Sequence, residues 1–356
     1  MQAAKAWAGR GDDVAVATVV GVKRSAPRPP GTKMAIGEDG AIAGAVSGGC
    51  VEGAVVAEAE AIRHGGSPRL LEYGISNEEA WDVGLQCGGE ISVWVERYDP
   101  RSDPLQERFT DLAREGERAA LVTVVRGPQA GAKLLVTAEG ERSGTLGDPA
   151  LDAAAVAHGD ELLWAERSEL RELGDHGLFV DVTAPPPRIV VFGAVDYSAT
   201  VCALARFLGW RPFVVDPRAA FARPERFPEA EDVVAAWPEE AFARLGGIDP
   251  ATAIVVLTHD PKLDDAALGL ALRSAPGYIG AMGSRHAQQA RRERLIAAGF
   301  GDADLARISA PVGLDLGALT AEETALSIMG EIVALRRGRQ GGRLAPAGGR
   351  IHAIAS

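Results

Sequence analysis

The stretch TAPPPRIVVFGAVDYS, residues 183–198, decides the fold, because it holds a domain boundary and the start of a sheet. The three consecutive prolines at 185–187 cannot continue a helix or a central strand, and they favour a stiff, extended connection. The apolar run RIVVF that follows, residues 188–192, is typical of a buried strand in a parallel sheet. We therefore predict a domain on each side of a proline linker, residues 183–187.

Segments after the linker alternate between strand-like and helix-like patterns. The expected strands are 188–192, 212–215, 232–234, 253–257, 278–280 and 307–310, and the expected helices are 198–209, 263–273, 284–298 and 321–337. Thr320 and Glu323 form a capping-box pattern before the last helix. This alternation predicts a Rossmann-like, doubly wound parallel sheet over residues 188–337. The glycine- and arginine-rich residues 338–356 are expected to be a disordered tail.

Residues 1–182 contain an internal repeat and predict an α+β domain. The matching segments are ATVV (17–20) with LVTVV (121–125), GTKMAI (31–36) with GAKLLV (131–136), and an Asp-Gly turn (39–40) with a Glu-Gly turn (139–140). An alanine-rich helical stretch follows each copy, at 51–64 and 150–165. Each copy is expected to form three strands and a helix, with the helices on one face of an antiparallel or mixed sheet.

The composition excludes several classes of protein. The 356 residues are 47% hydrophobic, which is enough for two cores, and the formal net charge is −12. An acidic chain of this kind is not expected to bind nucleic acid, which needs clustered lysine and arginine. No run is long enough for a membrane span, and the start is not typical of a secretory signal. Three cysteines make no disulfide framework, so we expect a cytoplasmic protein with free thiols.

The two copies diverge at one loop. SGGC at 47–50 in the first copy is replaced by GDPA at 147–150 in the second. Gly48, Gly49 and Cys50 are expected at a helix N-terminus, where free N–H groups favour anions and lower a thiol pKa. Two interpretations remain open: a site for a phosphate, a pterin-like ligand or sulfur chemistry, or a tight turn with a packed cysteine.

A second glycine-flanked thiol lies at Cys87-Gly88-Gly89, directly before the predicted strand 91–95. Glycines at this place let a ligand or another loop approach the backbone closely. If Cys50 and Cys87 face each other, they can hold a soft centre or exchange sulfur. Two thiols alone do not make a zinc site, so no metal site is predicted.

The loop after the strand 188–192 departs from the dinucleotide fingerprint G-x-G-x-x-G. Gly193 is present, but Val195 replaces the second glycine and obstructs the approach of a pyrophosphate. Asp196 adds a negative charge where phosphates would lie, whereas Asp216 suits a ribose hydroxyl. These residues favour a Rossmann scaffold with impaired or altered nucleotide binding over ordinary use of NAD(P).

Two further loops follow the fourth and fifth strands, at the sheet edge where open α/β sheets bind ligands. Gly283, Ser284 and Arg285 open a predicted helix and form a candidate anion cradle. His259 is a candidate acid–base group or, equally, a capping histidine. The basic cluster at 291–294 is expected to be a solvated helix face.

These segments together resemble a known family. PPGTKMAI, GAVSGGCVEGAV and LQCGGEISVWVE resemble the N-terminal domain of the XdhC/CoxI family, and GYIGAMGSR and PVGLDLGALTAEETALSIMGEI resemble its C-terminal domain. The resemblance covers nearly the whole chain except the tail. It implies an accessory protein, not a catalytic subunit, that binds molybdenum cofactor, protects it from oxidation and presents it for sulfuration. The implied partners are a cysteine desulfurase and a client enzyme of the xanthine dehydrogenase or carbon-monoxide dehydrogenase type, and the implied assembly is a homodimer.

The residues and the resemblance together define a set of candidate cofactor-binding residues and no catalytic residue. The set is Lys33, Ser47, Gly48, Gly49, Cys50, Glu52, Cys87, Gly88, Gly89, Gly193, Asp216, His259, Gly283, Ser284 and Arg285. Two alternatives remain. One is an NAD(P)-dependent oxidoreductase that uses Asp216 and His259, and the other is a scaffold that recruits an oxidoreductase without binding a small molecule.

Overall fold

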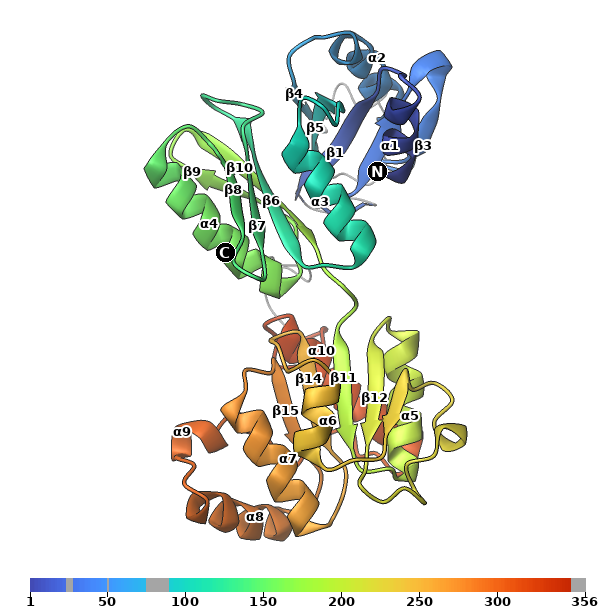
Figure 1. The fold of residues 1–356 in the computed structure, drawn as a ribbon, viewed down its shortest axis with the longest axis vertical. Coiled ribbons are helices and arrows are strands. Elements are labelled where there is room, and N and C mark those ends of the chain that lie inside the picture. Colours follow the sequence, from blue (N-terminus) through green and yellow to red (C-terminus); the bar gives the residue numbers. More distant parts are fainter. Residues whose placement is uncertain (24–27, 50, 75–89, 347–356) are drawn as a thin grey trace. The chain divides into compact units, whose positions relative to one another are not determined.

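The computed structural model describes residues 1–23, 28–49, 51–74 and 90–346. The chain divides into two compact units, residues 1–185 and 186–356 (Figure 1). Within the described residues, no helix has the length and apolar character that crossing a bilayer requires.

The first unit is built from two copies of one topology. Its strands are β1 (Ala15–Lys23), β2 (Lys33–Ile36), β3 (Ile42–Gly44), β4 (Arg69–Tyr73), β5 (Glu90–Arg97), β6 (Ala119–Arg126), β7 (Lys133–Thr137), β8 (Arg142–Thr145), β9 (Glu169–Leu173) and β10 (His176–Thr183). They form two antiparallel sheets, in the orders β3-β2-β1-β5-β4 and β8-β7-β6-β10-β9. The identical order confirms the internal repeat, but each copy has its own sheet, since strands missed by the sequence analysis (β4, β9 and β10) follow the helices.

Helices cover both faces of each sheet, which corrects the expectation that they lie on one face. They are α1 (Gln2–Gly9), α2 (Glu52–Arg63), α3 (Pro104–Glu115) and α4 (Pro149–Ala165), with a 3-10 turn η1 (Glu38–Gly40). Val14 and Val16 pack with Ala4 of α1, whereas Ala15 and Ala17 pack with α2 on the opposite face. Helices α3 and α4 cover the second sheet in the same way. Because neighbouring residues of a strand face opposite sides, helices on both faces explain why residues 15–20 of β1 are all buried.

The two copies contact each other reciprocally. Strand β1 lies against β9, and its counterpart β6 lies against β4. The apolar cluster at this contact consists of three pairs of equivalent residues, Val20 with Val125, Trp94 with Phe179, and Leu70 with Leu170. A register shift in each sheet places a β-bulge at Val20 and at Val125. The copies are therefore related by a pseudo-two-fold axis, like the protomers of a symmetric dimer.

The second unit is a single six-stranded parallel sheet. Its elements are β11 (Arg188–Phe192), α5 (Asp196–Phe207), β12 (Arg211–Val215), η2 (Pro224–Arg226), β13 (Asp232–Val234), α6 (Pro238–Arg244), β14 (Thr252–Val256), α7 (Pro261–Arg273), β15 (Tyr278–Ala281), α8 (Arg285–Ala297), α9 (Asp302–Leu305), β16 (Ile308–Ser309) and α10 (Ala321–Arg336). The strand order β13-β12-β11-β14-β15-β16 is that of a Rossmann sheet, which confirms the predicted fold.

Helices cover both faces of this sheet as well (Figure 1). Helices α5 and α10 pack on one face, whereas α6, α7 and α8 pack on the other. The predicted capping box is present, because Thr320 and Glu323 each accept a hydrogen bond from the other's backbone N–H. The short helices α6 and α9 were not predicted from the sequence.

Candidate functional site

The turn between β3 and α2 is organised by a carboxylate of its own helix. Glu52, the first residue of α2, accepts hydrogen bonds from the N–H groups of Val46 (3.2 Å), Ser47 (2.8 Å), Gly48 (2.8 Å) and Gly49 (2.8 Å), and from the Ser47 hydroxyl (2.5 Å). Gly48 and Gly49 have φ angles of +102° and +121°, which glycine adopts without strain. Successive amides can therefore converge on one anion, as in other backbone nests.

This geometry corrects the expectation that the amides of Gly48 and Gly49 are free. Both donate to Glu52, which occupies the place predicted for a ligand anion. Burial by itself would raise the pKa of Glu52, but the hydrogen bonds from Ser47 and Gly48 outweigh it and lower that pKa to about 2. Glu52 is consequently ionised near neutral pH and holds the shape of an exposed turn.

The cysteines divide into two groups. Cys50 and Cys87, with Gly88 and Gly89, lie outside the described residues. Cys202, on α5, is buried, and burial raises the pKa of its thiol to about 12. A thiol of this kind stays protonated near neutral pH and is a poor nucleophile.

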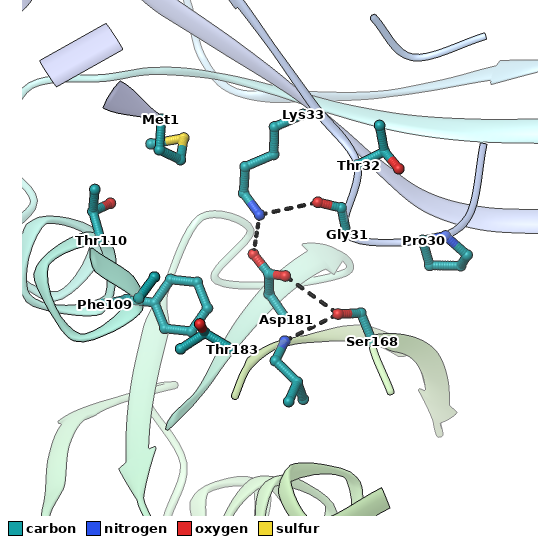
Figure 2. A pocket seen from close by; sticks show the side chains of 12 residues that line it. Met1, Pro30, Gly31, Thr32, Lys33, Phe109, Thr110, Ser168, Asp181 and Thr183 are labelled. Carbon is teal, nitrogen blue, oxygen red and sulfur yellow. Dashed lines mark hydrogen bonds and ion pairs between the residues drawn. The ribbon is translucent and has the colours of Figure 1, made fainter. Parts of the chain in front are cut away.

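Lys33 lies at the contact between the two copies of the first unit (Figure 2). Its Nζ donates to the carboxylate of Asp181, on β10 of the second copy, and to the backbone oxygen of Gly31 (3.3 Å). The hydroxyl of Ser168 donates to the other oxygen of Asp181 (3.3 Å). The ammonium also lies 5.9 Å from the ring centroid of Phe109. Within the described part of the chain, the contacts with Asp181 and Phe109 join Lys33 to the second copy, and no contact joins it to the 47–49 turn.

A cavity of about 310 Å³ opens beside this ion pair. Residues of both copies line it: Met1, Pro30, Gly31, Thr32, Lys33, Phe109, Thr110, Ala113, Ser168, Asp181, Val182 and Thr183. The lining combines one buried ion pair, four hydroxyls and an aromatic ring, which suits a polar ligand with a planar or apolar part. Asp181 and Ser168 were not predicted from the sequence, because no local pattern marks the residue that contacts Lys33.

In the candidate nucleotide site of the second unit, Asp216 is paired within the chain itself. Gly193 has a φ of +114°, and a Cβ atom there would lie 2.7 Å from Cγ2 of Thr258. Asp216 is fully buried, and its carboxylate accepts hydrogen bonds from the amide of Ala194 (2.9 Å) and from the guanidinium of Arg218 (2.6 and 2.8 Å). Burial by itself would raise the pKa of Asp216, but these donors outweigh it and lower that pKa. Asp216 is therefore paired within the chain itself, and its expected contact with a ribose hydroxyl stays a prediction.

The loops after β14 and β15 are joined by a buried ion pair. Arg291, expected on a solvated face, is buried and donates to Asp264 (2.8 Å) and to the backbone oxygen of Met282 (3.0 Å). Asp264 also accepts from the hydroxyl of Thr258 (2.7 Å). Burial raises the pKa of Asp264 despite the opposing effect of Arg291. The pair therefore fixes the position of both loops at the carboxyl edge of the sheet.

The predicted anion cradle and histidine lie at this edge in exposed positions. Ser284 is the N-cap of α8, and its hydroxyl accepts a hydrogen bond from the amide of Ala287 (3.2 Å). Gly283, with φ +133°, precedes it, and the side chain of Arg285 is exposed. His259 is also exposed, directly before Asp260, the N-cap of α7. The start of α8 therefore keeps the features of an anion site, whereas the Ser284 hydroxyl is used for capping.

Family comparisons match both units. Residues 7–74 and 112–174 match a family described as "XdhC and CoxI family", and residues 189–332 match "XdhC Rossmann domain". The first of these matches takes in both copies of the repeat.

Individual relatives align over almost the whole chain. A probable xanthine dehydrogenase subunit of Bacillus subtilis is 28% identical over 92% of this chain and 94% of its own length. "Molybdenum cofactor insertion chaperone PaoD" of Escherichia coli is 26% identical over 92% of this chain and 84% of its own length. A crystal structure described as a xanthine dehydrogenase from Bacillus halodurans is 25% identical, covers 97% of each chain and has a TM-score of 0.62.

Proposed function

Because the chain belongs to the XdhC and CoxI family, we propose that it binds molybdenum cofactor, protects it and delivers it to a molybdenum hydroxylase. The observation that carries the proposal is the alignment of both units with a relative named as a molybdenum cofactor insertion chaperone. The client is an enzyme of the xanthine dehydrogenase or carbon-monoxide dehydrogenase type, and delivery follows sulfuration by a cysteine desulfurase. The protein acts in the cytoplasm as a homodimer.

The chemistry of the cargo fits side chains on both units. Molybdenum cofactor is an anionic pterin with a phosphate, a dithiolene and an oxidisable metal, so it needs cations or amides for its phosphate and soft ligands near its metal. Lys33 supplies an ammonium beside a cavity, and the start of α8 supplies Arg285 and the positive end of a helix dipole. In this proposal, Cys50 and Cys87 are the thiols near the metal or the transferred sulfur.

The alternative of an NAD(P)-dependent oxidoreductase receives no such support. The acid that would bind the ribose, Asp216, is engaged by Arg218, and Val195 stands where the fingerprint has its second glycine. Calorimetry with NADH and NADPH at millimolar concentration is expected to give no binding heat.

Retention of the pterin is the direct test. The full chain is incubated anaerobically with an extract that contains molybdenum cofactor, repurified and oxidised, and its pterin is quantified by fluorescence. We expect near-stoichiometric pterin on the wild type and on Cys202→Ala, the matched control at a buried thiol. Cys50→Ala and Cys87→Ala are expected to retain at least tenfold less. A wild type without stoichiometric pterin contradicts cargo binding, and full retention by both cysteine variants contradicts the role of the thiols.

Delivery is tested separately. Loaded protein is mixed with a cofactor-free molybdenum hydroxylase, with and without a cysteine desulfurase and cysteine, and client activity is followed over time. We expect activity to appear only with the loaded protein, and to rise when the desulfurase is present. Equal activation by free cofactor would contradict a delivery role.

A further inference from the structure

The pseudo-two-fold axis of the first unit gives Lys33 a direct counterpart, Lys133. Lys33 lies opposite Thr18 in the first sheet, and Lys133 lies opposite Thr123 in the second. Their acidic partners are also equivalent, since Asp181 pairs with Leu121 and Glu96 pairs with Val16. Each lysine therefore crosses to the acid on the last strand of the other copy.

Lys133 shows which groups a lysine at this position can hold when two carboxylates of the chain surround it. Nζ of Lys133 contacts Glu96 at 2.6 Å and a second carboxylate, that of Asp103, at 2.5 Å. Burial by itself would lower the pKa of Lys133, but the two carboxylates outweigh it and raise that pKa. One buried ammonium thus holds two anionic groups, one on the strand and one from the N-cap of α3.

At Lys33 the second carboxylate is replaced by the cavity. An ammonium has three N–H donors, and the described contacts of Lys33 use two, to Asp181 and to Gly31. Its other neighbours in the described lining include no further carboxylate: Met1 carries the α-amino group, and Thr32, Thr110 and Thr183 offer hydroxyls. The Lys33 side therefore has room for one further oxyanion, which the Lys133 side takes from its own chain.

At three pairs of equivalent positions, the residue near Lys33 is smaller or more polar than the residue near Lys133. Thr183 stands where the first copy has the buried Tyr98, and Asp181 stands where it has the longer Glu96. Ser168 lies over Gly31, whereas Pro68 lies over the equivalent Gly131. All three differences enlarge the space or add a hydrogen-bonding group at one lysine only.

We propose that the Lys33 cavity is an oxyanion subsite, which takes the phosphate or carboxylate of a small organic molecule where Asp103 sits beside Lys133. A second cavity of about 420 Å³ shares Met1, Thr110 and Ala113 with it and extends past Lys5 and Arg114. The body of a ligand larger than its anionic group has room there. Where the occupant is the phosphate of molybdenum cofactor, the inference rests on the proposed function; where it is a free small anion, it does not.

Phosphate binding to the full chain tests the subsite. Inorganic phosphate and methyl phosphate are titrated at constant ionic strength and followed by calorimetry. We expect saturable binding by the wild type and by Lys262→Gln, a control at an exposed lysine of the second unit. Lys33→Gln is expected to weaken binding at least tenfold. Thr183→Tyr, which inserts the side chain of the equivalent Tyr98 without changing charge, is expected to do the same. Thermal unfolding of each variant confirms that it is folded.

The outcomes separate the subsite from the proposed function. Binding that is absent in the wild type, or equal in Lys33→Gln and Thr183→Tyr, overturns the inference. If both variants lose phosphate binding and also retain tenfold less pterin, the occupant is the phosphate of the cofactor. If they lose phosphate binding but retain the pterin of the wild type, the occupant is a separate small anion. A wild type that binds phosphate through Lys33 and retains no pterin supports the subsite and contradicts the proposed function.

Discussion

The two copies of the first unit share their strand order, their β-bulge and a lysine that contacts the other copy. They differ in the surroundings of this lysine and in the loop before the helix α2 or α4. Lys133 is enclosed by the carboxylates of Glu96 and Asp103, whereas Lys33 has one carboxylate and a cavity. A duplicated scaffold has therefore kept one lysine between two carboxylates and left its equivalent beside a cavity, where we propose that an oxyanion binds.

The loops before α2 and α4 differ in how many hydrogen bonds their equivalent carboxylates, Glu52 and Asp152, accept. Glu52 accepts hydrogen bonds from four backbone amides and one hydroxyl. The equivalent Asp152 accepts from the amide of Leu146 (2.6 Å) and the hydroxyl of Thr145 (2.7 Å), and Asp148 caps the helix instead. The first copy therefore concentrates its donors on one carboxylate, which shapes a glycine turn that the second copy lacks.

Replacing each lysine in turn is expected to give the largest difference in stability between the two copies. Lys133→Met leaves the buried carboxylate of Glu96 and the part-buried carboxylate of Asp103 without a cation, so we expect a loss of about 3–5 kcal/mol in the free energy of unfolding. Lys33→Met leaves only Asp181, beside a cavity that admits water, and is expected to cost about 1–2 kcal/mol. Urea denaturation of the full chain, with hydrogen exchange at β1 and β6 to identify the first unit, measures both. Equal losses would contradict the distinction between a filled and an open site.

Neutralising the two loop carboxylates, Glu52 and Asp152, is expected to lower the stability less than replacing Lys133 does. Glu52→Gln keeps the size of the side chain but replaces a charged acceptor of several amides, and we expect it to cost about 1–2 kcal/mol. Asp152→Asn is expected to cost less than about 1 kcal/mol, because fewer donors depend on it. Faster hydrogen exchange at the amides of residues 47–49 should accompany the first change. Unchanged exchange there would show that Glu52 does not hold the turn.

The pH dependence of stability gives a further test of the role of Glu52, and we expect it to be the smallest of these effects. The pKa of Glu52 falls from an ordinary 4.5 to about 2 on folding, so the folded state favours the ionised form. Its contribution is fully present above about pH 4.5 and is lost as the pH falls towards 2. The difference in stability between the wild type and Glu52→Gln should accordingly be constant from pH 5 to 7 and shrink below that. A difference that grows in acid would have the wrong sign.

Local signals explain why so much of the fold was predicted. Apolar runs such as 188–192 and 252–256, and the capping box at Thr320, depend on neighbouring residues alone, and their elements lie within a residue or two of the predictions. The repeat was visible because GTK and GAK recur before similar apolar strands. Strands β4 and β9 were missed because arginine and glutamate interrupt their apolar residues.

The candidate site was predicted less well, because its decisive contacts join distant residues. Arg291 was assigned to solvent from its basic neighbours, but its charge is paired with Asp264 on another helix. Asp216 suited a ribose by its position at the end of a strand, but Arg218 occupies its carboxylate in the folded chain. A position on an element is local information, whereas the partner of a side chain depends on packing.

The two domains, the duplication, the Rossmann-like sheet and the family could be predicted from the sequence, because each depends on patterns that neighbouring residues carry. The partners of Glu52 and Lys33 could not be predicted in this way: Glu52 accepts from the amides of its own turn, and Lys33 reaches Asp181 across the contact between copies. The physical reason is that a charge is satisfied by whichever opposite charge the folded chain brings within reach, and strand register and sheet contact set that reach.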